Sequence, residues 1–115
     1  MNKEILDCAK KIFTIINKKS IQGIDVLDVH ELTPLADIFI IATASNIRQT
    51  QAIANDVEDM LIEEGIRLRQ KEGYQTAKWI LMDYGNIIIH ILHEEEAEFY
   101  GLNRLWKDAP KFTFE

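Results

Sequence analysis

The sequence has only one cysteine and no long hydrophobic run, and both scarcities limit what the protein can be. Cys8 alone cannot form an intramolecular disulfide or a zinc site made of several thiols, which is typical of a reducing compartment. The longest apolar runs, such as residues 38–42 and 87–89, fall far short of the ~20 residues that cross a bilayer. The first residues show neither a signal-peptide core nor an arginine-rich transit segment. We therefore expect a cytoplasmic protein without a membrane span.

Basic residues are also scarce relative to acidic ones. The 13 Lys and Arg residues stand against 19 Asp and Glu residues, which gives a net charge of −6. Proteins that bind nucleic acid normally neutralise phosphates with clustered Lys and Arg, so direct nucleic-acid binding is disfavoured. An acidic surface suits a basic protein partner, although the same charge also serves solubility alone.

Glycine and proline are too few and too scattered to mark a linker. The five glycines and two prolines stand singly, at what look like the ends of elements. A chain of 115 residues with 47% hydrophobic content can bury a core without a metal or disulfides. We expect a single domain, residues 1–115.

The first 65 residues predict two helices and two strands. Apolar residues at spacings of three and four predict a helix over residues 3–17. Residues 24–29 are short and β-branched, which predicts a strand. Residues 37–43 hold five apolar residues in a row, the pattern of a central strand covered on both faces. Helical spacing returns from residue 47 until Gly65, with Ser45 placed as its N-cap.

The rest of the chain predicts a sheet edge, a hairpin and a short helix. Residues 66–71 alternate apolar and charged side chains, as an edge strand does. Residues 78–83 and 86–92 flank Tyr84-Gly85, a connection short enough for an antiparallel hairpin. Residues 94–100 predict a final helix that Gly101 ends. The expected fold class is α/β (α+β), with a mixed sheet of about five strands packed with helices.

Four aspartates were candidates for a metal site that supports nucleotidyl transfer: Asp25, Asp28, Asp37 and Asp83. A spacing of three places Asp25 and Asp28 on opposite faces of a strand, whereas a metal pair needs an even spacing. No glycine-rich turn precedes the second helix, because residues 43–46 contain no glycine. His90 and His93 are also three apart, and no nucleophile motif accompanies them. We expect no catalytic residue, no metal and no cofactor, and a nucleotidyltransferase-type enzyme is the less favoured alternative.

The strand at residues 78–83 carries large apolar groups on both of its faces. Trp79, Leu81 and Asp83 point to one side, and Ile80 and Met82 point to the other, which Tyr84 continues. An exposed tryptophan beside carboxylates is a typical anchor for a basic protein surface. A fully buried Trp79 is nearly as good an interpretation, so both stay open at this point.

Several separated stretches carry a family resemblance. They are Thr33-Pro34-Leu35-Ala36-Asp37 through Ala42-Thr43, Arg48-Gln49 to Ala54, Trp79-Ile80-Leu81-Met82-Asp83-Tyr84-Gly85 through His90 to His93-Glu94-Glu95, and Phe99-Tyr100-Gly101-Leu102-Asn103-Arg104-Leu105-Trp106. In this order they resemble the ribosomal silencing factor family, also called the Iojap-related family. The resemblance runs from the first helix to about Asp108.

The resemblance implies a nucleotidyltransferase-like fold without the catalytic aspartates, and a translational repressor that acts when nutrients are scarce. It implies binding to the fourteenth protein of the large ribosomal subunit, at the face where the small subunit joins, so that subunit association is blocked. That implied partner is basic, in agreement with the net charge of −6. It further implies homodimers in isolation. A factor for large-subunit biogenesis is an alternative with the same partner.

The family's docking surface, carried over by position, is centred on the strand that contains Trp79. It would comprise Trp79, Leu81, Asp83, Tyr84, Glu72, Gly73 and Tyr74.

Overall fold

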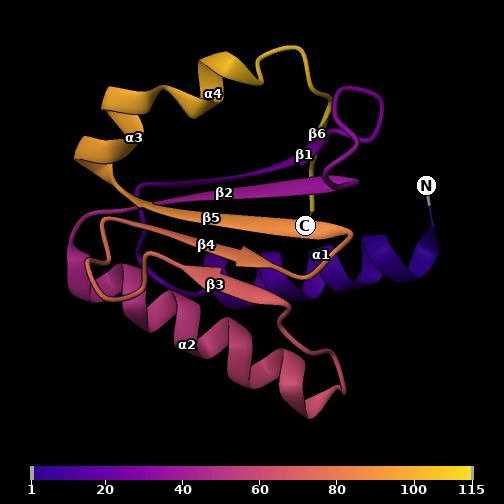
Figure 1. Ribbon diagram of the computed structural model, residues 1–115, viewed down its shortest axis with the longest axis horizontal. Coiled ribbons are helices and arrows are strands. Elements are labelled where there is room, and N and C mark those ends of the chain that lie inside the picture. Colours follow the sequence, from indigo (N-terminus) through magenta and orange to yellow (C-terminus); the bar gives the residue numbers. More distant parts are fainter. Residues whose placement is uncertain (1, 115) are drawn as a thin grey trace.

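The computed structural model describes residues 2–114 as one mixed sheet with helices on both of its faces (Figure 1). The elements, in chain order, are α1 (Lys3–Asn17), β1 (Gly23–Asp28), β2 (Ile38–Ala44), α2 (Ile47–Glu63), β3 (Gln70–Glu72), β4 (Trp79–Asp83), β5 (Ile87–His93), α3 (Glu94–Tyr100), α4 (Leu102–Leu105) and β6 (Lys111–Phe112). The expected fold class and both long helices are therefore confirmed.

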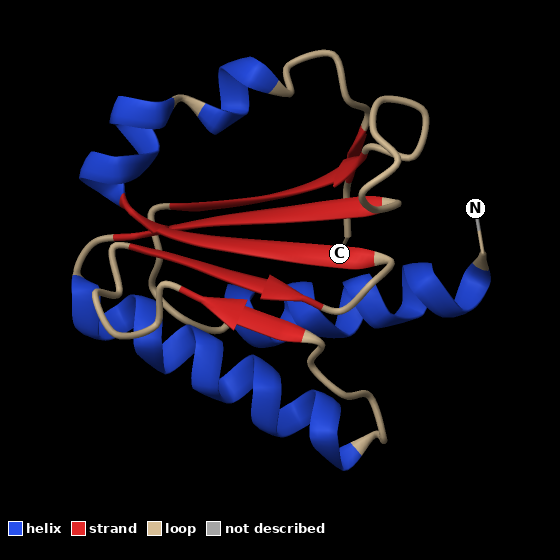
Figure 2. Cartoon of the chain, in the orientation of Figure 1, coloured by secondary structure: helices blue, strands red, loops and turns tan. Residues whose placement is uncertain are grey.

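The sheet has six strands in the order β3-β4-β5-β2-β1-β6 (Figure 2). Only β2 and β5 run parallel, and the other neighbouring strands are antiparallel. The prediction that β2 is central is confirmed, because β5 and β1 pair with its two edges. The predicted hairpin between β4 and β5 is also confirmed, and Gly85 takes the positive φ of 90° that its tight turn requires.

The two long helices cover the same face of the sheet, below it in Figure 1. Their apolar stripes pack against alternate residues of the four inner strands, and this face contains most of the core. The opposite face, which we call the open face, is formed mainly by Leu27, Phe39, Ile41, Trp79, Leu81, Ile88 and Leu92. The short helices α3 and α4, the segment after them, and Val29 and Ala36 of the β1–β2 connection pack against it. Most of this face is therefore buried, whereas Trp79 and Leu81 of β4 are only partly covered.

The N-cap of α2 is Asn46, and the prediction of Ser45 was wrong. The Asn46 side chain accepts a hydrogen bond of 2.8 Å from the Gln49 backbone N–H, which satisfies one of the unpaired donors of the first turn. Ser45 instead donates its backbone N–H to the Gln49 side chain at 3.1 Å. Asn46 therefore caps the helix through its side chain, whereas Ser45 contacts the first turn through its backbone N–H.

The edge strand begins later than predicted, at Gln70 instead of residue 66. Ile66 and Leu68 pack against the helix-covered core, so the chain contacts this core before it joins the sheet at Gln70. The sheet also has a sixth strand, which the estimate of about five missed. β6 is only two residues long and pairs with Val26 and Leu27 of β1, a partner far away in sequence. The short helix α4 was likewise not predicted.

Over residues 2–114, no helix combines the length and the apolar character that a membrane crossing needs.

Candidate docking surface

The residue on which the candidate site depends, Trp79, begins β4 on the open face and is neither fully buried nor fully exposed. Its indole Nε1–H donates a hydrogen bond to His90 Nδ1 at 3.2 Å, and its ring lies 4.9 Å from the ring of Tyr100. The edge strand β3 pairs with β4 only as far as Leu81, opposite Glu72. Beyond that pair the backbone of Gly73 lies beside Trp79, and the Trp79 side chain itself is only partly covered.

His90, on β5, supports the indole from inside the sheet. Its imidazole is only 8% exposed and makes an edge-on contact with Phe39, with ring centroids 5.1 Å apart. Burial disfavours the charged form and lowers the pKa of His90 to about 4, so the ring is neutral near pH 7. A neutral Nδ1 can accept the indole proton. His90 is thus a buried, hydrogen-bonded histidine and not a solvent-exposed one.

Leu81, Glu72 and Asp83 lie on the same side of the sheet as Trp79. Strand pairing aligns Glu72 with Leu81 and Gln70 with Asp83, and paired residues point to the same face. The Glu72 carboxylate is exposed and accepts a 2.8 Å hydrogen bond from the Gln70 side chain. Asp83 accepts the backbone N–H of Gly85 at 2.7 Å. Two carboxylates therefore border the apolar pair Trp79 and Leu81.

Tyr74 and Tyr84, which the resemblance assigned to the docking surface, pack against the helix-covered core instead. The Tyr74 hydroxyl hydrogen-bonds to Asn55 of α2 at 3.0 Å, and the Lys71 ammonium lies 4.5 Å from the centre of its ring. The Tyr84 hydroxyl is buried and, within residues 2–114, has no hydrogen-bond partner; burial raises the pKa of this phenol. The alternation that continues from β4 places the Tyr84 ring on the opposite side from Trp79, and the contact with Asn55 of α2 places Tyr74 there as well.

Gly73 supports the strand by allowing a close backbone approach. Its φ is +79°, and a Cβ atom built there would lie 2.0 Å from the carbonyl oxygen of Trp79. The structure thus places four of the seven assigned residues, Trp79, Leu81, Asp83 and Glu72, on one side of the sheet, and places Gly73, Tyr74 and Tyr84 behind or beneath them.

The loop that leads into β4 is fastened to α2. The Thr50 hydroxyl lies 2.6 Å from the Ala77 carbonyl oxygen, and the Gln51 side chain donates to the Tyr74 carbonyl at 2.9 Å. Ala77 is fully buried at a φ of 62°, a conformation that costs a non-glycine residue energy and persists only where its surroundings hold it. Helix α2 therefore sets the position from which Trp79 enters the sheet.

Three exposed apolar residues on the helices above the sheet were not predicted as part of the site, and one of them, Tyr100, contacts Trp79. Phe99, Tyr100 and Leu105 are 78%, 52% and 70% exposed, on α3 and α4. The only available signal in the sequence was the Phe99-Tyr100 pair directly after a run of glutamates. It was interpreted as the end of a short helix, and contact between Tyr100 and Trp79 depends on the tertiary fold.

The four aspartates tested for catalysis do not come together. Asp25 is on β1 and Asp83 is on β4, with β2 and β5 between them. Asp28 pairs with His30 at 2.5 Å, and Asp25 lies 3.6 Å from the Lys111 ammonium. Within residues 2–114, no group of three or more His, Cys, Asp or Glu side chains is arranged to hold a metal ion.

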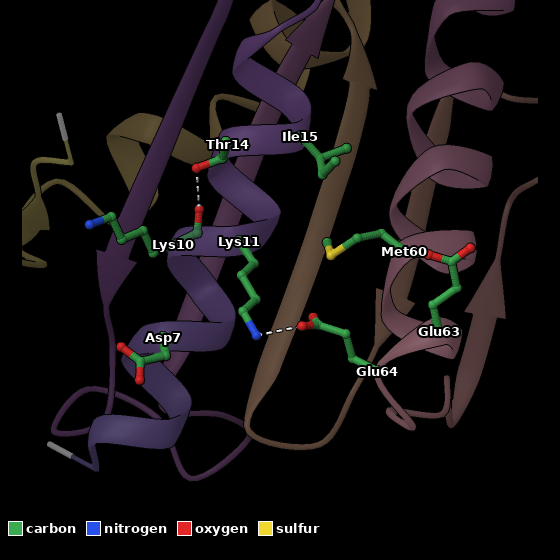
Figure 3. Close-up of a pocket in the computed structure, with 8 residues that line it drawn as sticks. All are labelled: Asp7, Lys10, Lys11, Thr14, Ile15, Met60, Glu63 and Glu64. Carbon is green, nitrogen blue, oxygen red and sulfur yellow. Dashed lines mark hydrogen bonds and ion pairs between the residues drawn. The ribbon is translucent and has the colours of Figure 1, made fainter.

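A groove lies on the other side of the molecule, between α1 and α2 (Figure 3). It has a volume of about 560 Å³ and is lined by Asp7, Lys10, Lys11, Thr14, Ile15, Met60, Glu63 and Glu64. Figure 3 shows Lys11 and Glu64 meeting across it in a 2.5 Å ion pair, while Asp7 and Lys10 point away. The Thr14 hydroxyl donates to the Lys10 carbonyl of its own helix.

The candidate site is thus a surface in which a partly covered tryptophan and Leu81 lie on the same side of the sheet as two carboxylates. The sequence model of the family described as "Ribosomal silencing factor during starvation" matches residues 2–115. The chain therefore belongs to the ribosomal silencing factor family, as the resemblance predicted.

Individual relatives agree with this assignment. The chain is 32% identical over 114 residues to "Ribosomal silencing factor RsfS" of Halalkalibacterium halodurans, covering 99% of this chain and 95% of the relative. It is 37% identical over 92 residues to the Bacillus subtilis protein of the same name, covering 80% and 78%. The crystal structure of protein CV0518 from Chromobacterium violaceum matches with a TM-score of 0.86 at 29% identity, covering 99% of this chain and 92% of that one.

A more distant relative carries a different name. "Mitochondrial assembly of ribosomal large subunit protein 1" of Mus musculus is 23% identical over 100 residues, which cover 83% of this chain and 43% of that protein.

Proposed function

We propose that this protein is a non-catalytic translational repressor that docks on the large ribosomal subunit, through its fourteenth protein, and blocks association with the small subunit. The observation that carries the proposal is the face of β4 that points away from α1 and α2, where Trp79 and Leu81 are partly exposed and Glu72 and Asp83 lie on the same side. Membership of the ribosomal silencing factor family supports it.

The apolar part of the surface is of the kind that anchors protein complexes. Tryptophan is enriched among the residues that dominate binding energy, because a large ring buries much area at little conformational cost. Trp79 is already held by His90 and Tyr100, so little side-chain freedom remains to be lost when a partner covers it. A preorganised anchor of this kind favours tight docking.

The charged part of the surface favours a basic partner. Glu72 is exposed and Asp83 is half-exposed, and neither forms an ion pair within residues 2–114. Carboxylates that are free of internal cations remain available to lysine and arginine of a ribosomal protein. The attraction between them should accelerate docking at low salt and weaken as salt is added.

Steric exclusion requires only size and position. The molecule measures 34 × 33 × 27 Å along its principal axes. Contact between two subunit surfaces requires atoms within about 4.5 Å, so a domain of this thickness on the joining face keeps them apart without any covalent step.

Co-sedimentation with isolated large and small ribosomal subunits tests the proposal. The wild-type protein is compared with Trp79→Ala and with Glu72→Lys, which reverses an exposed charge, at two salt concentrations. Ile62→Ala is the matched control, because Ile62 is 56% exposed on α2, away from the open face. We expect selective, salt-sensitive binding to the large subunit that both site variants weaken and the control retains. Equal binding by wild type and both folded site variants would refute the assigned surface, and no binding to either subunit would refute the function.

A role in large-subunit assembly is the second candidate, favoured by the name of the mouse relative. The same surface would then engage the ribosomal protein on assembly intermediates. Ribosome profiles from cells that lack the protein separate the two roles. Accumulated immature large subunits would favour assembly, whereas mature subunits that associate more readily in starved cells would favour silencing.

Self-association through the same surface is a further part of the proposal. A partly exposed tryptophan on the open face is a plausible contact between two copies of the free protein. Docking and dimerisation would then compete. A covalently cross-linked dimer should therefore bind large subunits more weakly than the monomer, and equal binding would exclude a shared surface.

A further inference from the structure

Helix α3 carries apolar side chains that the fold does not use. None of its seven residues is buried; Ala97 packs against the open-face cluster, and Tyr100 reaches it through its ring contact with Trp79. Phe99 is 78% exposed, although a helix of this length could have turned its aromatic residues toward the sheet. A large ring that stays in water contributes no free energy of burial, so the stability of the isolated domain does not explain why Phe99 is an exposed aromatic residue.

The exposed rings continue the surface that begins at Trp79. The ring of Tyr100 lies 4.9 Å from that of Trp79 and 5.0 Å from that of Phe99. Tyr100 thus joins the two in one aromatic row that runs from β4 to α3. The contact between Phe99 and Tyr100 is edge-on, with an interplanar angle of 80°.

The charges of α3 indicate what this row meets. Glu94, Glu95 and Glu96 form its first turn, where they stabilise the helix N-terminus, and Glu98 follows beside Phe99. Within residues 2–114, none of these four carboxylates takes part in an ion pair. Nucleic acid would be repelled here, whereas arginine suits both components, because its planar guanidinium stacks on aromatic rings and pairs with carboxylates.

We propose that Phe99, Tyr100 and Glu98 form a second half of the docking surface, which receives arginine side chains of a basic ribosomal protein. This inference rests on the proposed function and extends it to residues that the family resemblance did not assign. Trp79 and Leu81 form the apolar anchor, and the carboxylates and rings of α3 favour a basic protein over other partners.

Site-specific photo-cross-linking tests the inference with intact large ribosomal subunits as the probe. A benzophenone side chain replaces Phe99 in one protein, Glu72 in a second and Ile62 in a third, which serves as the control. We expect positions 99 and 72 to form an adduct with the same ribosomal protein and position 62 to form none. An adduct from position 72 but not from 99 would overturn this inference and leave the proposed function intact. An adduct between position 99 and ribosomal RNA would overturn the assignment of a protein partner.

Failure of the proposed function gives a different result, because then no position forms an adduct and the wild-type protein does not sediment with large subunits. Substitutions measure how much the proposed contacts contribute to large-subunit binding. Phe99→Ala should weaken large-subunit binding about tenfold with an unchanged melting temperature, because the side chain is mostly exposed. Leu35→Ala, at another exposed apolar residue, should change neither quantity. Glu98→Gln should reduce the salt dependence of binding, and unchanged salt dependence together with unchanged affinity of Phe99→Ala would also overturn the inference.

Discussion

Acidification from pH 6.5 to pH 4 is expected to destabilise the fold through His90, the buried imidazole beneath Trp79. Burial lowers the pKa of His90 from its ordinary 6.5 to about 4. Between these two pKa values the imidazole binds a proton in the unfolded chain but not in the folded one, so the free energy of unfolding falls as pH falls. Above pH 6.5 both states hold a neutral ring, and this group makes stability independent of pH. Protonation also removes the acceptor of the Trp79 indole N–H.

The size of the effect follows from the shift. A difference of about 2.5 pH units, at about 1.36 kcal/mol per unit, amounts to about 3 kcal/mol lost by pH 4. His90 is only 8% exposed, so solvent screens little of this penalty. Domains of this size are typically stable by about 5–15 kcal/mol, which makes the loss readily measurable.

Urea unfolding followed by circular dichroism at pH 7, 6, 5 and 4 measures the loss, with His90→Gln as the control. The glutamine amide can still accept the indole proton but does not titrate. All ionisable groups except His90 are the same in the two proteins, so their contributions to the pH dependence of stability cancel in the comparison. The wild type should lose about 3 kcal/mol more than the variant on going from pH 7 to pH 4. Parallel stability profiles for the two proteins would refute the reasoning.

Two further substitutions test the support beneath the docking surface. Gly73→Ala should destabilise the fold by more than about 2 kcal/mol in urea unfolding. The reason is that a Cβ atom would lie 2.0 Å from the Trp79 carbonyl oxygen, at a backbone φ of +79°. Gly23→Ala is the control and should change stability little, because a Cβ atom there would have nothing within 4 Å. A stable Gly73→Ala protein would show that this close approach is not required. Thr50→Val should cost about 1–3 kcal/mol, because it leaves the buried Ala77 carbonyl without the hydroxyl 2.6 Å away. Thr14→Val, which removes an exposed hydroxyl, should cost much less, and equal costs would contradict the role of Thr50.

The two layers of the molecule divide its tasks. On the helix-covered face, α2 holds the loop before β4 through Thr50 and Gln51. On the open face, the same strand presents Trp79 and Leu81. A change beneath the sheet can therefore alter docking by moving β4, whereas a change at Phe99 acts on the surface alone. Measuring stability together with ribosome binding distinguishes these two causes.

Local chemistry was sufficient to predict the order of the elements and part of the site. Side-chain periods of 3.6 and 2 residues predicted α1, α2 and the hairpin, and the period of 2 also placed Trp79, Leu81 and Asp83 on one side of β4. These features depend on sterics within a few residues, so a sequence carries them directly. The helix cap was missed by one residue, because Ser45 and Asn46 are both good caps and backbone geometry selects between them.

Only the tertiary structure decided which face of the sheet stays open. Both faces of β4 are apolar enough to be core, and the choice depends on α1 and α2 packing together on the side of Ile80 and Met82. The pairing of β6 with β1, the late start of β3 and the contact between Tyr100 and Trp79 likewise join segments that are distant in sequence. The composition by itself predicts an acidic domain whose net charge of −6 favours a basic partner. The packing of the two long helices decided which apolar side chains of β4 remain partly exposed, because burial is settled by the whole chain.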